Sequence, residues 1–191
     1  MTIPFEDEIR ELESEAERSD AGTAAHILNR AGDMCLGQGR KDRALSYYGR
    51  AIDANLYGRR YDAAAGLCRK LLRISPRSVR TRCTLAWLAL GHGDLQETVR
   101  ELGEYVSAAI DAGERERAAT NLAAMAAVTP DRRIRELLAA HLERIGKPAD
   151  AEALRGGSQE AGGANASAGG DTEEERWTRI VNAALGEPKD R

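Results

Sequence analysis

Apolar residues recur at helical spacing along most of this chain, and no stretch shows the alternation expected of a half-buried strand. In "TPDRRIRELLAAHLERIGKP", for example, Thr129 is expected to cap a helix with Pro130 in its first turn. Gly146 and Pro148 are expected to end the same helix. Helices of about 12 to 17 residues joined by short turns lie antiparallel to their neighbours. The pattern therefore predicts an all-α fold of antiparallel helices.

The chain also matches itself when it is shifted along its own sequence. A shift of 54 residues superimposes Gly37 on Gly91, Gly39 on Gly93 and Pro76 on Pro130. Internal repetition of this kind is typical of helical-repeat proteins, in which each repeat buries its apolar face against the next. Three helices per repeat reverse the chain direction in an up-down stack, so we do not expect a simple translational repeat.

The segment "LNRAGDMCLGQGRKDRALSYYGRAI" resembles a tetratricopeptide repeat, in which small residues let two helices approach and larger ones fill the adjacent groove. The residues that carry the resemblance are Leu28, Ala31, Gly32, Cys35, Ala44, Tyr48 and Ala51. Partial echoes follow near Pro76 and Pro130, with spacings that alternate near 20 and 34 residues. The first-helix Trp and Tyr of the family are missing from the first copy. The resemblance implies an α-solenoid domain over residues 21–154, with a groove that binds a peptide or a helix.

Three segments outside that domain differ from it in composition. Residues 1–20 are strongly acidic and carry an apolar stripe at helical spacing, which predicts an acidic amphipathic helix. Residues 155–170 are rich in Gly, Ala and Ser, so we expect a disordered linker that buries little apolar surface. Residues 171–187 begin with a capping box, Thr172 and Glu175, and predict a separate helix. Its apolar face consists of Trp177, Ile180, Val181, Ala184 and Leu185.

A helix of this length is marginal by itself, so it needs a groove to pack into. It can fold back on its own domain, since the ends of solenoids need a cap. It can also insert into another protein with Trp177 as its anchor, or pair with a second copy of the chain. A membrane surface is disfavoured because the polar face is rich in acid and not in Lys.

Arginine is concentrated between residues 40 and 82. The residues predicted to contact a partner are Arg69, Arg73, Arg77 and Arg80 of this segment, with Trp87 just after it. Guanidinium groups suit bidentate pairing with carboxylates, so the predicted partner is an acidic peptide or protein. The competing interpretation is a solvated face that the acidic helix of residues 1–20 partly neutralises. The resemblance does not imply a ligand that ends in a carboxylate, because Asn29 and Asp33 replace the Lys and Asn of the family's carboxylate clamp.

Nothing in the sequence indicates catalysis, a metal or a cofactor. The two G-x-G glycine pairs follow helices, whereas a nucleotide loop follows a strand, so we interpret them as helix ends. No Cys or His pair has metal-ligand spacing. Nucleic acid is disfavoured because the net charge is -3 and aromatic residues other than Trp87 are not interleaved with the arginines. A nucleic-acid-associated or enzymatic protein using the arginine-rich surface is the alternative to an interaction module.

The remaining bulk features concern the compartment. The chain has 191 residues, 42% of them apolar and 31% charged, which is typical of a soluble globular protein. An odd number of widely spaced cysteines favours a reducing cytoplasm. The acidic start lacks the features of a signal peptide, and no apolar run has the length of a membrane span. We therefore predict a cytoplasmic protein–protein interaction module that acts as a scaffold, an adaptor or a regulator.

Overall fold

The computed structural model describes residues 4–160 and, in the C-terminal tail, residues 172, 174, 175, 177, 178, 180 and 181. These residues are helical or lie in turns, with no strand among them, so the predicted all-α fold is confirmed. The contacts divide the chain into two compact units, one ending at Pro76 and the other beginning at Arg77. The sequence prediction of a single domain over residues 21–154 did not place this boundary.

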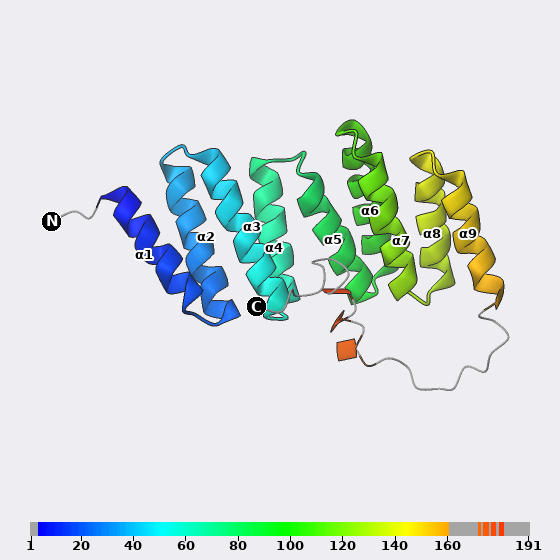
Figure 1. Cartoon of the computed structure of the whole chain (residues 1–191), viewed down its shortest axis with the longest axis horizontal. Helices are drawn as coiled ribbons and strands as arrows, with labels where there is room; N and C mark the ends of the chain where they lie inside the picture. The colour runs from blue at the N-terminus through cyan, green and yellow to red at the C-terminus, as the bar shows by residue number, and fades with distance from the viewer. Residues whose placement is uncertain (1–3, 161–171, 173, 176, 179, 182–191) are drawn as a thin grey trace. The chain divides into compact units, whose positions relative to one another are not determined.

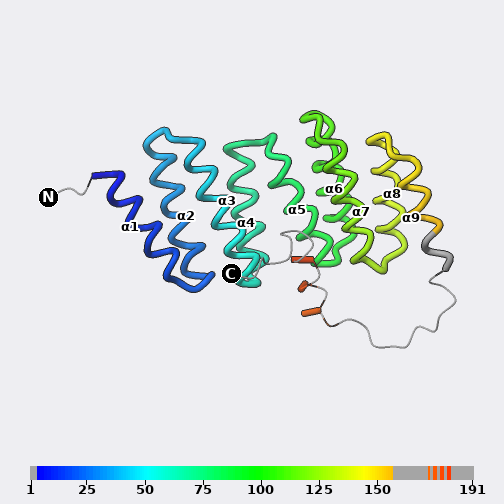
Figure 2. The backbone as a smooth tube through the Cα atoms, viewed as in Figure 1, coloured from blue at the N-terminus to red at the C-terminus, as the bar shows by residue number. Residues whose placement is uncertain are grey.

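The first unit contains four helices (Figure 1), namely α1 (Phe5–Glu17), α2 (Ala21–Gly37), α3 (Lys41–Tyr57) and α4 (Tyr61–Ile74). Within this unit each helix packs on the next, and the chain reverses direction at each turn (Figure 2). The acidic helix α1 packs against α2 and so belongs to this unit. Its core is built from small, aliphatic and aromatic side chains, of which Ile9, Ala31, Cys35, Tyr48, Ala51 and Cys68 are almost fully buried.

The second unit contains five helices before the tail, namely α5 (Val79–His92), α6 (Leu95–Asp111), α7 (Arg115–Val128), α8 (Arg132–Arg144) and α9 (Pro148–Glu160). Helix α5 packs on α6 and α7, and α8 packs on α7 and α9. Its largest fully buried side chains are Leu102, Tyr105, Leu122, Met125, Leu138 and Leu142.

The helix boundaries follow the 54-residue shift seen in the sequence. Helix α3 spans Lys41–Tyr57, and the same numbers raised by 54 are the bounds of α6, Leu95–Asp111. The same shift carries α4, Tyr61–Ile74, onto α7, Arg115–Val128. Both turns that contain G-x-G also match, because Gly39 and Gly93 adopt positive φ angles of 72° and 75°. These glycines end helices α2 and α5, as predicted, because only glycine adopts this conformation at no steric cost.

The turn between α3 and α4 differs from the other helix turns in one respect. The glycine of this turn, Gly58, comes one residue before the position that needs a positive φ. Arg59 occupies that position instead and takes the left-handed conformation with a φ of 56°. A side chain in this region is strained relative to glycine, by about 1 kcal/mol or more. The first unit therefore contains a local cost at the end of α3 that the equivalent turn after α6, with Gly113, avoids.

Several helix ends differ from the sequence prediction. Helix α8 begins at Arg132, and its N-cap is Asp131, whose carboxylate accepts a hydrogen bond from the Arg133 N–H at 2.8 Å. The predicted cap at Thr129 is therefore wrong, because a carboxylate nearer to the helix satisfies the free N–H groups. Pro148 does not close α8 but opens α9, where proline at the first position costs no hydrogen bond.

The predicted linker also begins later than expected. Helix α9 continues to Glu160, so residues 155–160 of the predicted 155–170 linker are helical. The remaining residues of the predicted linker, 161–170, lie outside the described residues. Two glycines, Gly156 and Gly157, are included in the helix despite their low propensity.

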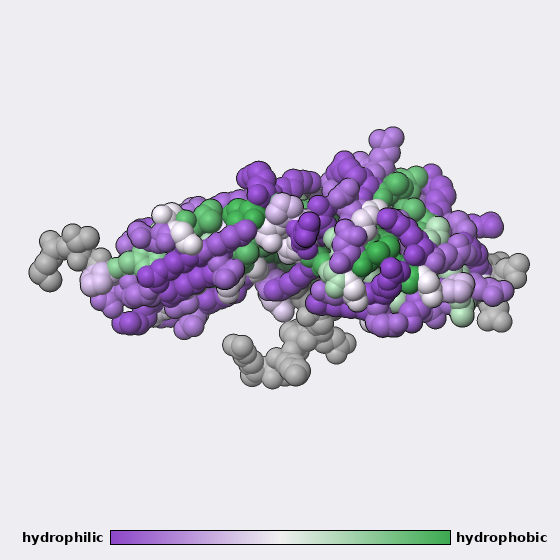
Figure 3. Space-filling model, turned by 90° about the horizontal axis from the view of Figure 1, so that it is seen from above, coloured by the Kyte–Doolittle hydropathy of each residue, from purple (hydrophilic) through white to green (hydrophobic). Residues whose placement is uncertain are grey.

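Most of the surface seen in Figure 3 is hydrophilic, with limited apolar areas. Among the described residues, the large apolar side chains that remain exposed are Leu36, Tyr57 and Val99. Helix α5, in contrast, is buried along much of its length, because every residue from Leu85 to Gly91 is buried. Seven consecutive buried residues cover every side of a helix, so α5 is enclosed over almost two turns.

A close contact between α2 and α3 sets the geometry of the first unit and can be tested. A Cβ atom at Gly32 would lie 2.6 Å from Cε1 of Tyr48, whose ring is fully buried. We expect Gly32→Ala to lower the free energy of unfolding of this unit by about 1–3 kcal/mol, because the ring cannot move without repacking. Gly66→Ala in α4 is the control, since its Cβ meets nothing within 4 Å and should be neutral or stabilising. Urea denaturation followed by circular dichroism compares the two variants, and equal stability would contradict the close packing.

Candidate interaction surfaces

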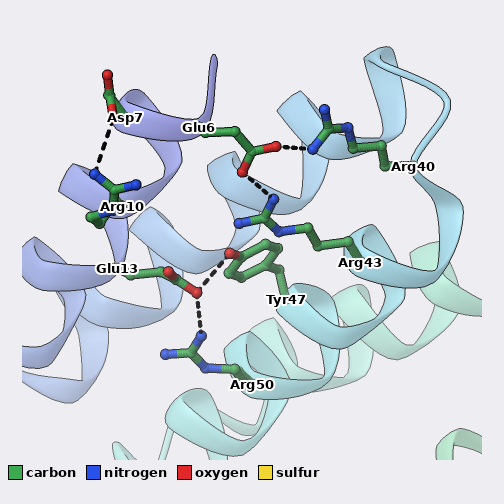
Figure 4. A network of polar contacts seen from close by, with 8 residues as sticks. All are labelled: Glu6, Asp7, Arg10, Glu13, Arg40, Arg43, Tyr47 and Arg50. Atoms are coloured by element: carbon green, nitrogen blue, oxygen red, sulfur yellow. Dashed lines mark hydrogen bonds and ion pairs between the residues drawn. The ribbon is translucent and has the colours of Figure 1, made fainter. Parts of the chain in front are cut away.

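The acidic helix α1 lies along the arginine-bearing side of α3 (Figure 4). The Glu6 carboxylate accepts hydrogen bonds from Arg40 and from Arg43, the latter with an Nη1–Oε2 distance of 2.7 Å. Two turns along α1, Glu13 accepts a hydrogen bond from the Tyr47 hydroxyl at 2.7 Å and pairs with Arg50 at 3.3 Å. Acidic groups of one helix are therefore matched in register to basic and phenolic donors of another.

Both faces of α1 take part in this contact. Its apolar stripe, Ile9, Leu12 and Ala16, is buried in the core of the unit. At its first turn the guanidinium of Arg40 lies over the Phe5 ring, 4.6 Å from the ring centroid. Such cation–π contacts add a favourable term beyond the ion pairs. The surface of α2 and α3 thus holds an acidic amphipathic helix through apolar burial on one side and guanidinium contacts on the other.

The electrostatics of these groups follow from their partners. Hydrogen bonds from Arg43 and Arg40 hold the pKa of Glu6 below its ordinary value of 4.5. Burial, followed by the hydrogen bond to Glu13, raises the pKa of Tyr47, so its hydroxyl remains a donor at neutral pH. The carboxylate of Glu6 is about half exposed, so salt screens its pairs with the arginines.

A second polar cluster joins α2, α3 and α4 in the same unit. The Nζ of Lys70 donates to Asn29 at 2.8 Å and to Asp33 at 2.5 Å, and it lies 4.5 Å from the centroid of the Tyr48 ring. The Tyr48 hydroxyl donates to the same Asp33 oxygen at 2.6 Å. Burial opposes ionisation of Asp33, but the hydrogen bonds from Lys70 and Tyr48 lower its pKa. The Lys70 ammonium is thus matched to a carboxylate of its own chain.

The arginines predicted to contact a partner belong to two different units of the chain. Arg69 and Arg73 are exposed on α4 in the first unit, whereas Arg77 and Arg80 are exposed in the second unit, before and at the start of α5. Trp87 was expected on an open surface, but only 2% of it is exposed, so it belongs to the core and that expectation needs correction. Its indole lies within the buried run of α5, which the apolar sequence "LAWLALG" in hindsight indicates.

The tail residue Trp177 lies on the carboxyl end of α5, where the tail is drawn in orange in Figure 1. A Cβ atom at Gly91 would lie 2.3 Å from Cζ3 and 2.4 Å from Cη2 of the indole. The His92 ring meets the same indole edge-on, with 5.1 Å between centroids and an angle of 79° between the ring planes. Trp177 is 5% exposed in this seat. We call the contact formed by Gly91 and His92 the indole seat.

The other tail residues agree with the expected helix wherever the structure describes them. Thr172 and Glu175 form the capping box, with the Thr172 N–H donating to Glu175 at 2.9 Å and the Glu175 N–H donating to Thr172 at 3.2 Å. Ile180 is buried with Trp177, and Val181 is partly buried. Leu185 lies outside the described residues. The residues described between 174 and 181 are helical.

The comparisons with known proteins add nothing to this geometry. No protein-family model, curated protein or solved structure matches the chain. In the part of the chain that the structure describes, no helix is long and apolar enough to cross a membrane. Among the same residues, no group of three or more His, Cys, Asp or Glu side chains is arranged to hold a metal ion.

Sequence reasoning found the tail helix and its anchor but missed the seat. Gly91 was interpreted only as part of a helix end, and His92 only as one of three scattered histidines. A glycine before the last residue of a helix, followed by a second glycine in the turn, was the available signal. It indicates a place where another group approaches the backbone closely. The individual pairs of Glu6 and Glu13 were also missed, although the charge match between residues 1–20 and the arginines was noticed.

The pH dependence of the α1 contact follows from the lowered pKa of Glu6. A carboxyl group whose pKa is depressed by folding contributes stability above its unfolded pKa, and the contribution is lost as pH falls through the folded pKa. We therefore expect the α1 contact to be fully formed above pH 4.5 and to weaken as the pH falls further below this value. Titration of the Glu6 carboxyl carbon by NMR measures the shift directly. Arg43→Gln should return the pKa toward 4.5, and an unchanged titration in that variant would show that the pair is absent in solution.

Proposed function

We propose that this protein is an interaction module that binds an acidic amphipathic helix or peptide of another protein on its helical-repeat surface. The observation that carries the proposal is the contact of α1 with α3, in which Glu6 and Glu13 pair with Arg40, Arg43, Tyr47 and Arg50. It is an example within the chain of the ligand class that this surface accepts. A scaffold, an adaptor and a regulatory protein all use such a surface.

The chemistry of the α3 surface favours a helix over an extended peptide. Glu6 and Glu13 are seven residues apart, which is two turns of a helix, and Arg43 and Arg50 on α3 have the same spacing. Two helices that run alongside each other therefore keep acid and base matched over two turns. An extended strand would carry the two carboxylates about 23 Å apart, about twice the helical spacing.

The alternative function, a nucleic-acid-associated or enzymatic protein using the arginine-rich surface of residues 40–82, is less well supported. Phosphate binding by arginine depends on cations that the fold leaves available for the ligand. Arg40, Arg43, Arg50, Lys70 and Arg82 each contact a carboxylate of the same chain. An incoming acidic helix must displace α1 from the same arginines, but it can place its carboxylates where Glu6 and Glu13 lie.

The family and the compartment are also part of this proposal. A tetratricopeptide-like repeat agrees with small residues in the α2–α3 contact, where Ala31 and Gly32 face a second helix whose Tyr48 is buried. A reducing compartment, which we take to be the cytoplasm, agrees with free thiols at Cys35, Cys68 and Cys83. The proposed partner is a protein, and the proposal requires no cofactor.

The proposal is tested by converting α1 into a ligand that can exchange. A protease site inserted after Arg18, in the turn between α1 and α2, allows cleavage of the folded chain and competition with a labelled peptide of residues 1–18. We expect the labelled peptide to bind, and a peptide carrying Glu6→Gln and Glu13→Gln to bind roughly three- to ten-fold more weakly at low salt. Fluorescence anisotropy measures both affinities, and 1 M salt should reduce the difference because the carboxylates are half exposed.

The control peptide carries Glu11→Gln and Glu15→Gln, which keeps the charge change but spares the residues that face α3. Equal affinities for all three peptides would show that the surface does not select carboxylates at these positions, and the proposed function would then be wrong. A salt-sensitive gel shift with generic double-stranded DNA, in the absence of peptide selectivity, would support the nucleic-acid alternative instead.

A further inference from the structure

We infer that the indole seat on α5 is a built binding site for a tryptophan-anchored amphipathic helix, and that Trp177 of the same chain occupies it as the anchor of a tethered ligand. The inference goes beyond the proposed function, because it concerns the second unit and an apolar ligand. It assigns a role to Gly91 and His92 that neither the arginine-rich surface nor the acidic helix requires.

The shape of the seat depends on the missing Cβ atom of Gly91. A helix normally presents a Cβ atom at every position, and this atom keeps a flat ring away from the backbone. At Gly91 that atom is absent, and the edge of the Trp177 indole occupies its place, with Cζ3 only 2.3 Å from the position where the Cβ would be. Only glycine at position 91 allows the indole to lie this close to the helix.

The equivalent glycine in the first unit does not lie against an aromatic ring. The 54-residue shift pairs Gly91 in α5 with Gly37 in α2, and both are at the carboxyl ends of equivalent helices. A Cβ atom added at Gly37 would meet nothing within 4 Å, and Gly37 is exposed. A glycine at this point of the repeat therefore does not by itself bury a ring. The seat forms in the second unit, where the tail supplies the indole.

The side of α5 that ends at Gly91 differs in polarity from the equivalent side of α2. Residues 83, 87 and 91 lie one above another on α5, because they are four apart. In α5 these positions hold Cys83, Trp87 and Gly91, whereas the equivalents in α2 are the polar pair Asn29 and Asp33, followed by Gly37. The repeat therefore has a polar stripe in one unit and an apolar stripe in the other. At its end this stripe contacts the tail through Gly91, which lies against the buried indole of Trp177.

The segment between α9 and Thr172 connects the tail helix to its own domain. Eleven residues, 161–171, join the end of α9 to Thr172, and their composition is almost wholly Gly, Ala and Ser. Linkers of such composition hold a ligand at an effective concentration on the order of millimolar, which favours binding within the chain over binding between chains. The tail helix has its own capping box but is too short to be stable alone, so its folding is coupled to occupation of the seat. These properties describe a ligand that can leave the seat and return.

The experiment is hydrogen–deuterium exchange on the full-length protein, comparing wild type with Gly91→Ala. The new methyl group would overlap the indole and displace it, so we expect the amides between residues 174 and 181 to exchange at least roughly ten-fold faster in the variant. Gly37→Ala is the matched control, since it makes the same change at the equivalent position, where nothing is displaced. Alanine is a better helix former than glycine, so faster exchange in Gly91→Ala cannot be ascribed to a weakened α5.

A second measurement tests whether the seat accepts a ligand from outside. A labelled peptide of residues 171–187 should bind the full-length Trp177→Ala variant more tightly than wild type, because that variant leaves the seat empty. The double variant Trp177→Ala with Gly91→Ala should bind the peptide roughly ten-fold or more weakly than Trp177→Ala does. Fluorescence anisotropy provides the affinities, and the melting curves of the variants show that the second unit is folded.

Three results would overturn the inference. Free exchange of residues 174–181 in the wild-type protein would show that the tail does not occupy the seat. Protection that appears only at high protein concentration would assign the occupant to a second copy and not to the same chain. Equal exchange in Gly91→Ala and Gly37→Ala would show that the seat does not hold the indole. None of these outcomes depends on the α1 peptide experiment, so the two proposals can fail separately.

Discussion

In both units an aromatic ring lies directly on a glycine inside a helix, Tyr48 on Gly32 in the first and Trp177 on Gly91 in the second. The absence of a Cβ atom lets the ring approach the backbone, and the ring in turn fills the space that a small residue would leave empty. The packing of α2 against α3 in the first unit depends on such a contact. Tyr48 also reaches Asp33 with its hydroxyl, so the ring links the core of the first unit to its polar cluster.

The charges of the chain act mainly within it. The net charge of -3 conceals a first helix rich in acid, whose Glu6 and Glu13 meet Arg43 and Arg50 of α3 in the folded first unit. Each exposed ion pair of this kind contributes little to the free energy of unfolding, so we interpret the pairs as fixing the position of α1 relative to α3. Glu6 and Glu13 fix the register of α1 on α3, while burial of Ile9 and Leu12 supplies most of the attraction. A surface that combines such ion pairs with apolar burial can select a ligand by its charges and bind it through apolar contacts.

The same helical plan is used twice with different chemistry on one stripe. Helices α3 and α6, and helices α4 and α7, have bounds that differ by 54 residues, so these pairs have equal lengths, whereas α2 has 17 residues and α5 has 14. The stripe of α2 presents Asn29 and Asp33 to Lys70, whereas the equivalent stripe of α5 is apolar and ends in the indole seat. Divergence of the stripe, and not of the helices, gives each unit its own class of contact: carboxylates and amines in one, an indole in the other.

The sequence by itself determined the all-α class, most helix positions and the capping box of the tail, because periodicity and capping depend on residues that are close along the chain. It also determined the 54-residue repeat and identified Trp177 as an anchor. It did not determine the boundary after Pro76, the burial of Trp87 or the extension of α9 to Glu160, since these depend on contacts between helices. The pairing of Glu6 with Arg43, 37 residues apart, and of Trp177 with Gly91 was decided only by the tertiary structure. A side chain's type limits what it can bind, but the packing of distant segments decides which partner it meets.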